Sequence, residues 1–118
     1  MISDRITEDT ERCTVRVSLL DVETIRKLRH KMPDLAGQSG KISPNLYTRA
    51  LIVRGLSRLE SKNKISWTIP NYRTSNNLTI PVWVDAWIYE LADREGRSMS
   101  EIAQTALELG RAQVLSSR

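Results

Sequence analysis

The side chains of this 118-residue sequence that could take part in catalysis do not form a recognisable set. One histidine, His30, and one cysteine, Cys13, are present, which excludes an internal disulfide and a zinc site made of cysteines. We find no Ser–His–Asp set, no glycine-rich phosphate loop and no isolated pair of carboxylates. We therefore expect no enzymatic activity, no cofactor and no metal.

Arg16 raises a different question, because it stands in the middle of the segment CTVRVSLL (residues 13–20). Two valines alternate there with Thr14, Arg16 and Ser18, which is the pattern of a strand with one apolar and one polar face. A single strand cannot form a sheet. It therefore needs a partner elsewhere in the chain, and its polar face needs something to contact.

The net charge of +4 and the pI of about 9.6 are modestly basic, and the basic residues are concentrated in the first half. Residues 1–64 contain 13 Lys and Arg against 8 Asp and Glu, whereas residues 65–118 contain 5 against 6. This distribution fits a polyanion such as nucleic acid. A surplus of this size is also common on proteins that bind none, so the charge alone does not decide.

Composition and the chain start restrict the class of protein further. Hydrophobic residues make up 40% and aromatic residues 5%, with no Phe, so the core must consist mainly of Leu, Ile, Val and Ala, which favours helices. The apolar stretches are short and interrupted, which excludes a transmembrane segment. The polar N-terminus excludes a signal peptide. We expect a protein of an intracellular, reducing compartment with no membrane partner. The same polar start also fits a fragment of a longer protein.

Apolar residues at helical spacing predict four helices, over residues 22–32, 43–59, 84–96 and 98–115. Ser18 or Asp21 caps the first, Ser43 and Pro44 begin the second, Gly96 ends the third, and Ser98 or Ser100 caps the fourth. The buried stripe expected in the second helix is Leu46, Ala50, Val53 and Leu56. A second alternating segment, NLTIPV (77–82), precedes the third helix, and ISWTI (65–69) is a candidate for a short extra strand.

The order strand–helix–helix thus occurs twice. A shift of 63 residues aligns Val15 with Leu78, and a shift of 56 residues aligns Leu46 with Ile102 in the second helices. The difference of seven residues corresponds to a longer loop in the first half. We expect a single compact domain over 1–118, made of a first repeat (12–60), a linker (61–74) and a second repeat (75–115).

Each strand is the partner that the other requires. Paired antiparallel, the two strands form a ribbon over a core of four helices, so the expected fold class is mainly α with a two-stranded ribbon. The side chains expected to face the helices are Val15, Val17, Leu78 and Ile80, with Cys13 in the same register. Their burial is worth several kcal/mol at about 25 cal/mol per Å². A slip of one residue would expose all of them.

The elements in this order resemble the ribbon-helix-helix family of DNA-binding proteins. The resemblance is carried by a short alternating strand, an amphipathic helix and the segment GRSMSEIAQTAL (96–107) that opens the last helix. In the first half, GKISPNLYTRAL (40–51) stands at the corresponding place after a longer loop. Members of the family usually dimerise, each subunit giving one strand. Two copies in one chain therefore resemble a single-chain, tandem pseudo-dimer.

The resemblance implies that the ribbon enters the major groove of double-stranded DNA, where base edges can be distinguished. The base-reading residues are then Arg12, Thr14 and Arg16 from the first strand and Ser75, Asn77 and Thr79 from the second. Arginine can pair with guanine, and asparagine with adenine, through two hydrogen bonds. The phosphate contacts at the starts of the second helices are then Lys41, Ser43 and Asn45 in one repeat and Arg97, Ser98 and Ser100 in the other. Because the two strands differ, the DNA site is expected to be asymmetric.

Within this family, the chain looks most like accessory factors of plasmid conjugation and T-DNA transfer, including virulence proteins that bind DNA beside T-DNA borders. The resemblance thus implies a sequence-specific DNA-binding protein of the bacterial cytoplasm, either a transfer accessory factor or a transcriptional regulator. Further self-association and relaxosome-type protein partners are compatible with it. Two other functions stay open from the residues: a protein–protein interaction module of the antitoxin kind, and a binder of single-stranded nucleic acid.

Overall fold

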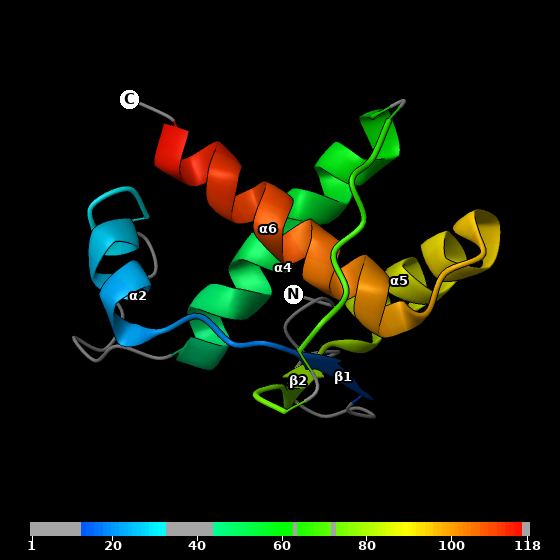
Figure 1. The fold of residues 1–118 in the computed structure, drawn as a ribbon, viewed down its shortest axis with the longest axis horizontal. Coiled ribbons are helices and arrows are strands. Elements are labelled where there is room, and N and C mark those ends of the chain that lie inside the picture. Colours follow the sequence, from blue (N-terminus) through cyan, green and yellow to red (C-terminus); the bar gives the residue numbers. More distant parts are fainter. Residues whose placement is uncertain (1–12, 33–43, 63, 72, 117–118) are drawn as a thin grey trace, which may run out of the picture.

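The computed structural model describes residues 13–32, 44–62, 64–71 and 73–116. This part of the chain is mostly helical and contains one two-stranded antiparallel sheet, which confirms the expected fold class at that level. The elements, in chain order, are β1 (Cys13–Val17), α2 (Val22–Arg29), α4 (Pro44–Ser61), β2 (Asn76–Ile80), α5 (Val82–Glu95) and α6 (Met99–Ser116) (Figure 1). Among the described residues, no helix has the length and apolar character needed to cross a bilayer.

The centre of the molecule is the crossing of the two longest helices, α4 and α6 (Figure 1). Two glycines make this crossing possible. A Cβ atom at Gly55 of α4 would collide with the backbone carbonyl of Ala106, and one at Gly110 of α6 would collide with that of Leu51. The two backbones therefore approach more closely than any larger residue at these positions would permit.

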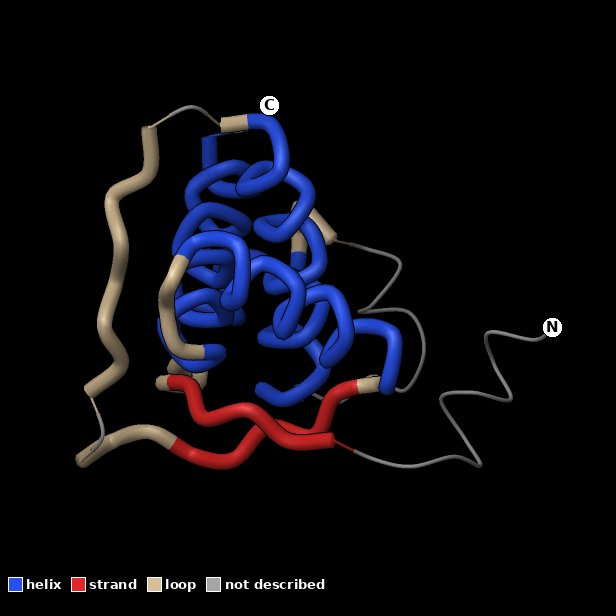
Figure 2. The backbone as a smooth tube through the Cα atoms, turned by 90° about the vertical axis from the view of Figure 1, so that its right-hand side faces the viewer, coloured by secondary structure: helices blue, strands red, loops and turns tan. Residues whose placement is uncertain are grey.

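The β1–β2 ribbon lies along one side of the helices, with its inner face against the core (Figure 2). Val15 stands opposite Leu78 in the antiparallel register, and Cys13 stands opposite Ile80. The four side chains expected to face the helices, Val15, Val17, Leu78 and Ile80, are all buried. The register is therefore fixed by burial, since a shift of one residue would turn these side chains to solvent.

The main differences from the sequence-based expectation concern the end of α2 and the buried face of α4. The first helix, α2, ends at Arg29 instead of residue 32. In α4, Leu56 of the four expected stripe residues is fully buried and Ala50 and Val53 are half-buried against the core, so the expected stripe covers only one side of the buried face. The face that is buried carries Tyr47, Thr48, Leu51, Ile52, Gly55, Leu56 and Leu59. A polar Thr48 and a side-chain-free Gly55 lie in this interface, and a count of apolar side chains gives no weight to either.

Buried polar side chains attach the extended segments to the two long helices. Gln104 of α6 accepts from the backbone N–H of Ser18 through Oε1 at 2.8 Å, just after β1 ends. Thr48 of α4 accepts from the N–H of Leu20 at 3.4 Å. Thr105 of α6 accepts from the N–H of Thr68 at 2.8 Å. These bonds satisfy groups that would be costly to bury unpaired, and they fix where the connections run.

The connection between α4 and β2 is an extended segment that passes along α6, with no strand at residues 65–69 (Figure 1). Ile65 and Trp67 are half-buried against the core, whereas Ile69 between Thr68 and Pro70 is exposed. The segment is therefore packed on the helices, although its polar composition had indicated only a linker.

The helix ends settle the alternatives that the sequence left open. Asp21 caps α2 by accepting from the N–H of Thr24 at 2.7 Å. Gly96 ends α5 in the left-handed conformation, with φ of 67°. Ser98 caps α6 by accepting from the N–H of Glu101 at 3.1 Å. Ser43, the cap expected for α4, lies outside the described residues.

Candidate nucleic-acid interface

The outward face of the ribbon carries four polar side chains in two directly opposed pairs. Thr14 of β1 stands opposite Thr79 of β2, and Arg16 stands opposite Asn77. Thr14, Arg16 and Asn77 are exposed, and Thr79 is half-buried. Side chains of a strand alternate between its faces, so burial of the valines and of Leu78 on the inner face directs these four residues outward. The structure thus places four of the six expected base-reading residues side by side on one surface.

Ser75, expected to face outward, is buried with a relative exposure of 8%. Its Oγ accepts a hydrogen bond from Nε of Arg16 at 2.8 Å. This contact crosses from the segment preceding β2 to the middle of β1, and it orients the guanidinium on the ribbon surface. Ser75 is therefore placed as a positioning residue for Arg16. Arg12, the sixth expected residue, lies outside the described part of the chain.

The start of α6 is closed by its own side chains. Ser98 and Glu101 form a reciprocal cap, in which Glu101 Oε1 accepts from the N–H of Ser98 at 3.4 Å and the N–H of Glu101 donates to Ser98 Oγ. Arg97 forms an ion pair with Glu101 at 3.1 Å, and its guanidinium lies over the ring of Trp67, 4.9 Å from the centroid. The Arg97 hydrogen bond, with help from Ser98, holds the pKa of Glu101 below its ordinary value.

These contacts weaken the case for phosphate binding at α6. The carboxylate of Glu101 lies in the first turn, where it offsets the positive end of the helix dipole that would attract an anion. Arg97 is committed to Trp67 and Glu101, and Ser98 to the cap. Ser100 is half-buried in the first turn. The three residues expected to contact phosphate here are thus brought together, but they are largely engaged within the protein.

The start of α4 differs from the start of α6, because its first turn contains no acidic residue. Asn45 is exposed in that turn, whereas Lys41 and Ser43 lie outside the described residues. Both long helices begin at the end of the molecule where the ribbon lies, cross near its centre and diverge beyond the crossing (Figure 1). Of the two helix starts, the one at α4 has the electrostatic character that favours a phosphate.

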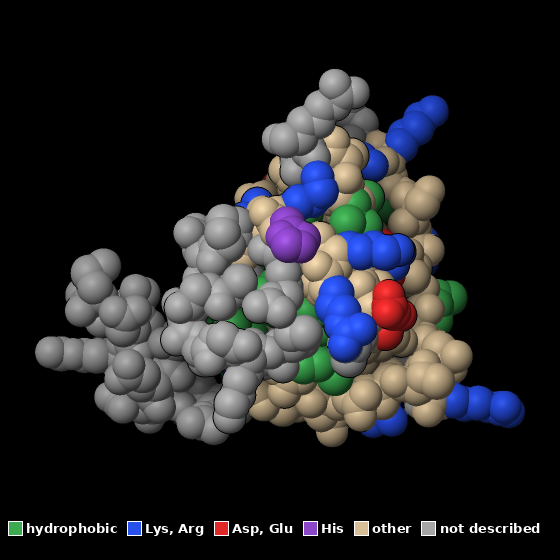
Figure 3. Space-filling view, turned by 90° about the vertical axis from the view of Figure 1, so that its left-hand side faces the viewer, with side chains coloured by type: hydrophobic (Ala, Val, Ile, Leu, Met, Phe, Trp, Pro, Cys, Tyr) green, Lys and Arg blue, Asp and Glu red, His purple; other side chains and the backbone are tan. Residues whose placement is uncertain are grey.

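Basic side chains also occur away from the ribbon. Lys and Arg side chains gather on the face that carries α2, with few acidic side chains among them (Figure 3). In α2, Arg26 and Lys27 are exposed, and Arg26 forms an ion pair with Glu23 at 3.6 Å. The Glu23 carboxylate offsets part of this charge, and α2 contributes no residue to the outward face of the ribbon.

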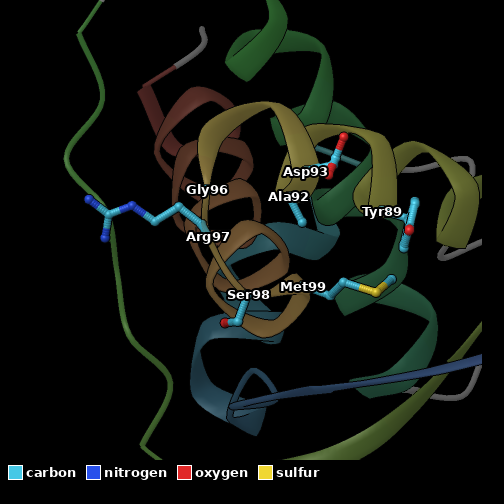
Figure 4. Close-up of a pocket in the computed structure, with 7 residues that line it drawn as sticks. All are labelled: Tyr89, Ala92, Asp93, Gly96, Arg97, Ser98 and Met99. Carbon is cyan, nitrogen blue, oxygen red and sulfur yellow. The ribbon is translucent and has the colours of Figure 1, made fainter.

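A groove of about 410 Å³ lies at the turn between α5 and α6 and is lined by residues of both signs (Figure 4). Its lining residues are Tyr89, Ala92, Asp93, Gly96, Arg97, Ser98 and Met99. The Arg97 side chain points out of it, toward the extended segment that carries Trp67 (Figure 4). Within the described residues, no three His, Cys, Asp or Glu side chains are grouped to hold a metal.

Two contributions to this surface were missed by sequence reasoning. The role of Ser75 depends on a contact between residues 59 positions apart, which no local pattern contains. Gln104 was not singled out in the sequence, although it is buried and holds the end of β1. A glutamine inside the apolar run IAQTAL is the one signal that could have indicated it.

Comparisons of the chain with protein-family models, with curated proteins and with solved structures found no match. The class of protein is therefore argued from the geometry of the ribbon and the helices that carry it.

Proposed function

We propose that this protein binds double-stranded DNA in a sequence-specific manner, by inserting the β1–β2 ribbon into the major groove. The observation that carries the proposal is the outward row of Thr14–Thr79 and Arg16–Asn77 on a ribbon whose other face is anchored to helices. A two-stranded ribbon fits the major groove, and these residue types are donors and acceptors for base edges. No catalytic role is part of the proposal.

The chain is, on this proposal, a tandem ribbon-helix-helix protein in which the two repeats form a pseudo-dimer. The pairing register supports this. In a two-fold ribbon, the central residue must stand opposite its own equivalent. Val15 stands opposite Leu78, and these two residues are the ones that the 63-residue shift aligns. Gly55 approaches Ala106 and Gly110 approaches Leu51, which is within one residue of the pairing that a two-fold crossing of α4 and α6 with the 56-residue shift would give.

The same relation predicts an asymmetric DNA site. The pseudo-two-fold axis carries Arg16 to the position of Thr79, and Thr14 to that of Asn77. The two halves of the reading surface therefore present different side chains to the two half-sites. Each well-placed bidentate pair contributes about 1–3 kcal/mol of discrimination, so the half-sites differ in sequence.

For the biological role, we propose a bacterial cytoplasmic DNA-binding factor of plasmid biology, acting as an accessory factor in conjugation or T-DNA transfer or as a transcriptional regulator. Support for this finer assignment comes from the family resemblance of the strand and of GRSMSE. Such a role requires recognition of one DNA site in one orientation, which a reading surface of unlike halves supplies.

Selection of bound duplexes from a random pool, followed by gel-shift titration across salt, tests the proposal. We expect an asymmetric consensus, preference for duplex over single strands, and affinity that falls as salt rises because phosphate contacts release counterions. Equal competition by single strands would assign the protein to single-stranded nucleic acid. Affinity that does not depend on salt would favour a protein–protein module.

A further inference from the structure

A second groove lies at the end of the molecule away from the ribbon. It has a volume of about 480 Å³ and is lined by Val53, Arg54, Ser57, Arg58, Ser61 and Gln113. Five of these residues belong to the second half of α4, and Gln113 belongs to the last turns of α6. The helices cross near Gly55 and Gly110, so the groove lies at and beyond the crossing, where α4 and α6 diverge (Figure 1).

The side chains that line this groove are those that contact phosphate groups. Arg54 and Arg58 are both exposed and are one helical turn apart, about 6 Å along the axis. That spacing is close to the separation of neighbouring phosphates along one strand. Ser57, Ser61 and Gln113 add hydroxyl and amide groups, which with arginine account for many protein contacts to phosphate oxygens.

The carboxylates near this groove are directed elsewhere. No acidic residue lines it. Glu60, the closest acid in sequence, accepts from Nε1 of Trp87 at 2.9 Å and pairs with Arg94 at 3.0 Å, both on α5. Glu108 of α6 pairs with Arg111. Neither Arg54 nor Arg58 forms an ion pair within the described part of the chain, so their charge is available to a ligand.

The carbonyl end of α4 opposes an anion, but this effect falls off within the last helical turn. Arg54 is nearly two turns before Ser61, where α4 ends, and Arg58 lies in the last turn, where its charge offsets the dipole. Among the lining residues, only Val53 is apolar, which leaves little surface for the hydrophobic side of a bound peptide helix. A nucleic-acid backbone therefore fits this groove better than an acidic peptide does.

We propose that this groove binds the phosphate backbone of a second DNA duplex, so that one protein molecule can bridge two duplex segments. The bridging step rests on the proposed function, because it requires one duplex to be held by the ribbon. Binding of a phosphate backbone in the groove does not. Arg54 is ten residues after Pro44, about 15 Å along α4 from the end where the ribbon lies. A straight duplex held by the ribbon does not extend to the groove. The DNA bound in the groove must therefore be a different duplex segment.

Direct binding of a short random-sequence duplex separates the two sites. The ribbon variant Arg16→Ala/Asn77→Ala is expected to retain weak, salt-dependent binding, and adding Arg54→Gln/Arg58→Gln is expected to reduce it further. Loss of two phosphate contacts lowers the slope of log affinity against log salt by about 2 and the affinity at low salt by about tenfold. The matched control Arg26→Gln/Lys27→Gln removes the same charge from α2 and should leave this residual binding within about twofold.

A capture assay then tests bridging. The selected duplex is immobilised, the protein is bound to it, and a labelled random duplex is added. We expect capture by the natural protein and by the α2 control, and about tenfold less capture by Arg54→Gln/Arg58→Gln with unchanged binding to the immobilised site. Equal capture by the groove variant, or equal loss in the control, would overturn the inference.

The outcomes distinguish this inference from the proposed function. If the ribbon substitutions have no effect while the groove substitutions abolish duplex binding, the ribbon proposal fails and the groove stands. If the natural protein binds its selected duplex but captures no second one, the groove proposal fails alone. Polyglutamate and unlabelled duplex DNA can be compared as competitors at equal concentrations of negative charge. If polyglutamate displaces the labelled duplex at the lower concentration, the groove binds acidic polypeptides and the groove proposal is overturned.

Discussion

At the scale of single residues, Arg16 is the side chain with the strongest claim to sequence recognition. It is exposed, stands opposite Asn77 and is oriented by Ser75. We expect Arg16→Ala to weaken binding to the selected duplex by about 5- to 150-fold, because a bidentate arginine–base pair contributes about 1–3 kcal/mol. Fluorescence anisotropy with selected and random duplexes measures this. An equal loss on both duplexes would make Arg16 a phosphate contact and remove it from base reading.

On the proposed function, Ser75 affects DNA recognition through its hydrogen bond with Arg16 and not by contacting DNA. We expect Ser75→Ala to lower affinity for the selected duplex by severalfold, less than Arg16→Ala does, because the guanidinium loses one of the contacts that orient it. In the Arg16→Ala background, Ser75→Ala should have no further effect on DNA binding. Additive losses in the double variant would show that Ser75 acts independently of Arg16.

At the scale of elements, the crossing of α4 and α6 depends on glycine at one close approach. We expect Gly55→Ala to destabilise the protein by about 3 kcal/mol, because the added methyl group would meet the rigid carbonyl of Ala106. Gly96→Ala is the matched comparison. It has open space for a Cβ but a φ of 67°, and it should cost about 1 kcal/mol. Urea unfolding measures both, and equal costs would argue against a backbone collision at the crossing.

The cap at the start of α6 gives stability a defined pH dependence. The Arg97 and Ser98 contacts lower the pKa of Glu101 in the folded protein, so its contribution is present above its ordinary pKa of 4.5 and is lost as pH falls through the folded value. We expect Glu101→Gln to lower the melting temperature at about pH 7 and to have little effect at about pH 3. A difference between the two proteins that persists in acid would contradict this account.

The elements also indicate how far sequence reasoning reaches in this chain. Alternation in CTVRVSLL and NLTIPV predicted both strands, their pairing and the burial of Val15 and Leu78, because period-two burial is a local signal. The α4 face was predicted only in part, because Thr48 and Gly55 lie at its interface without being apolar. The contact of Ser75 with Arg16 and the packing of Trp67 under Arg97 depend on tertiary structure, which no local pattern encodes.

At the scale of the whole molecule, the proposed pseudo-two-fold axis through Val15 and Leu78 makes the orientation of the protein on DNA a property of four side chains. Exchanging them across the axis rotates the reading surface while the rest of the chain stays in place. The exchanged variant carries Thr14→Asn, Arg16→Thr, Asn77→Thr and Thr79→Arg. We expect it to select the same consensus as the natural protein and to bind it in the opposite orientation, with severalfold lower affinity because an arginine at position 79 lacks the Ser75 contact.

Orientation can be read by cleavage of the DNA from a chelated iron attached near the start of α5, through Ala86→Cys in a Cys13→Ser background. Ala86 is exposed, follows β2 by six residues and lies in the second repeat only, so cleavage should be stronger on one side of the site. We expect the stronger side to change between the natural reading surface and the exchanged one. Unchanged cleavage with an unchanged consensus would mean that helix contacts, such as those at the unlike starts of α4 and α6, set the orientation. A lost consensus would mean that the ribbon is not read as two related halves.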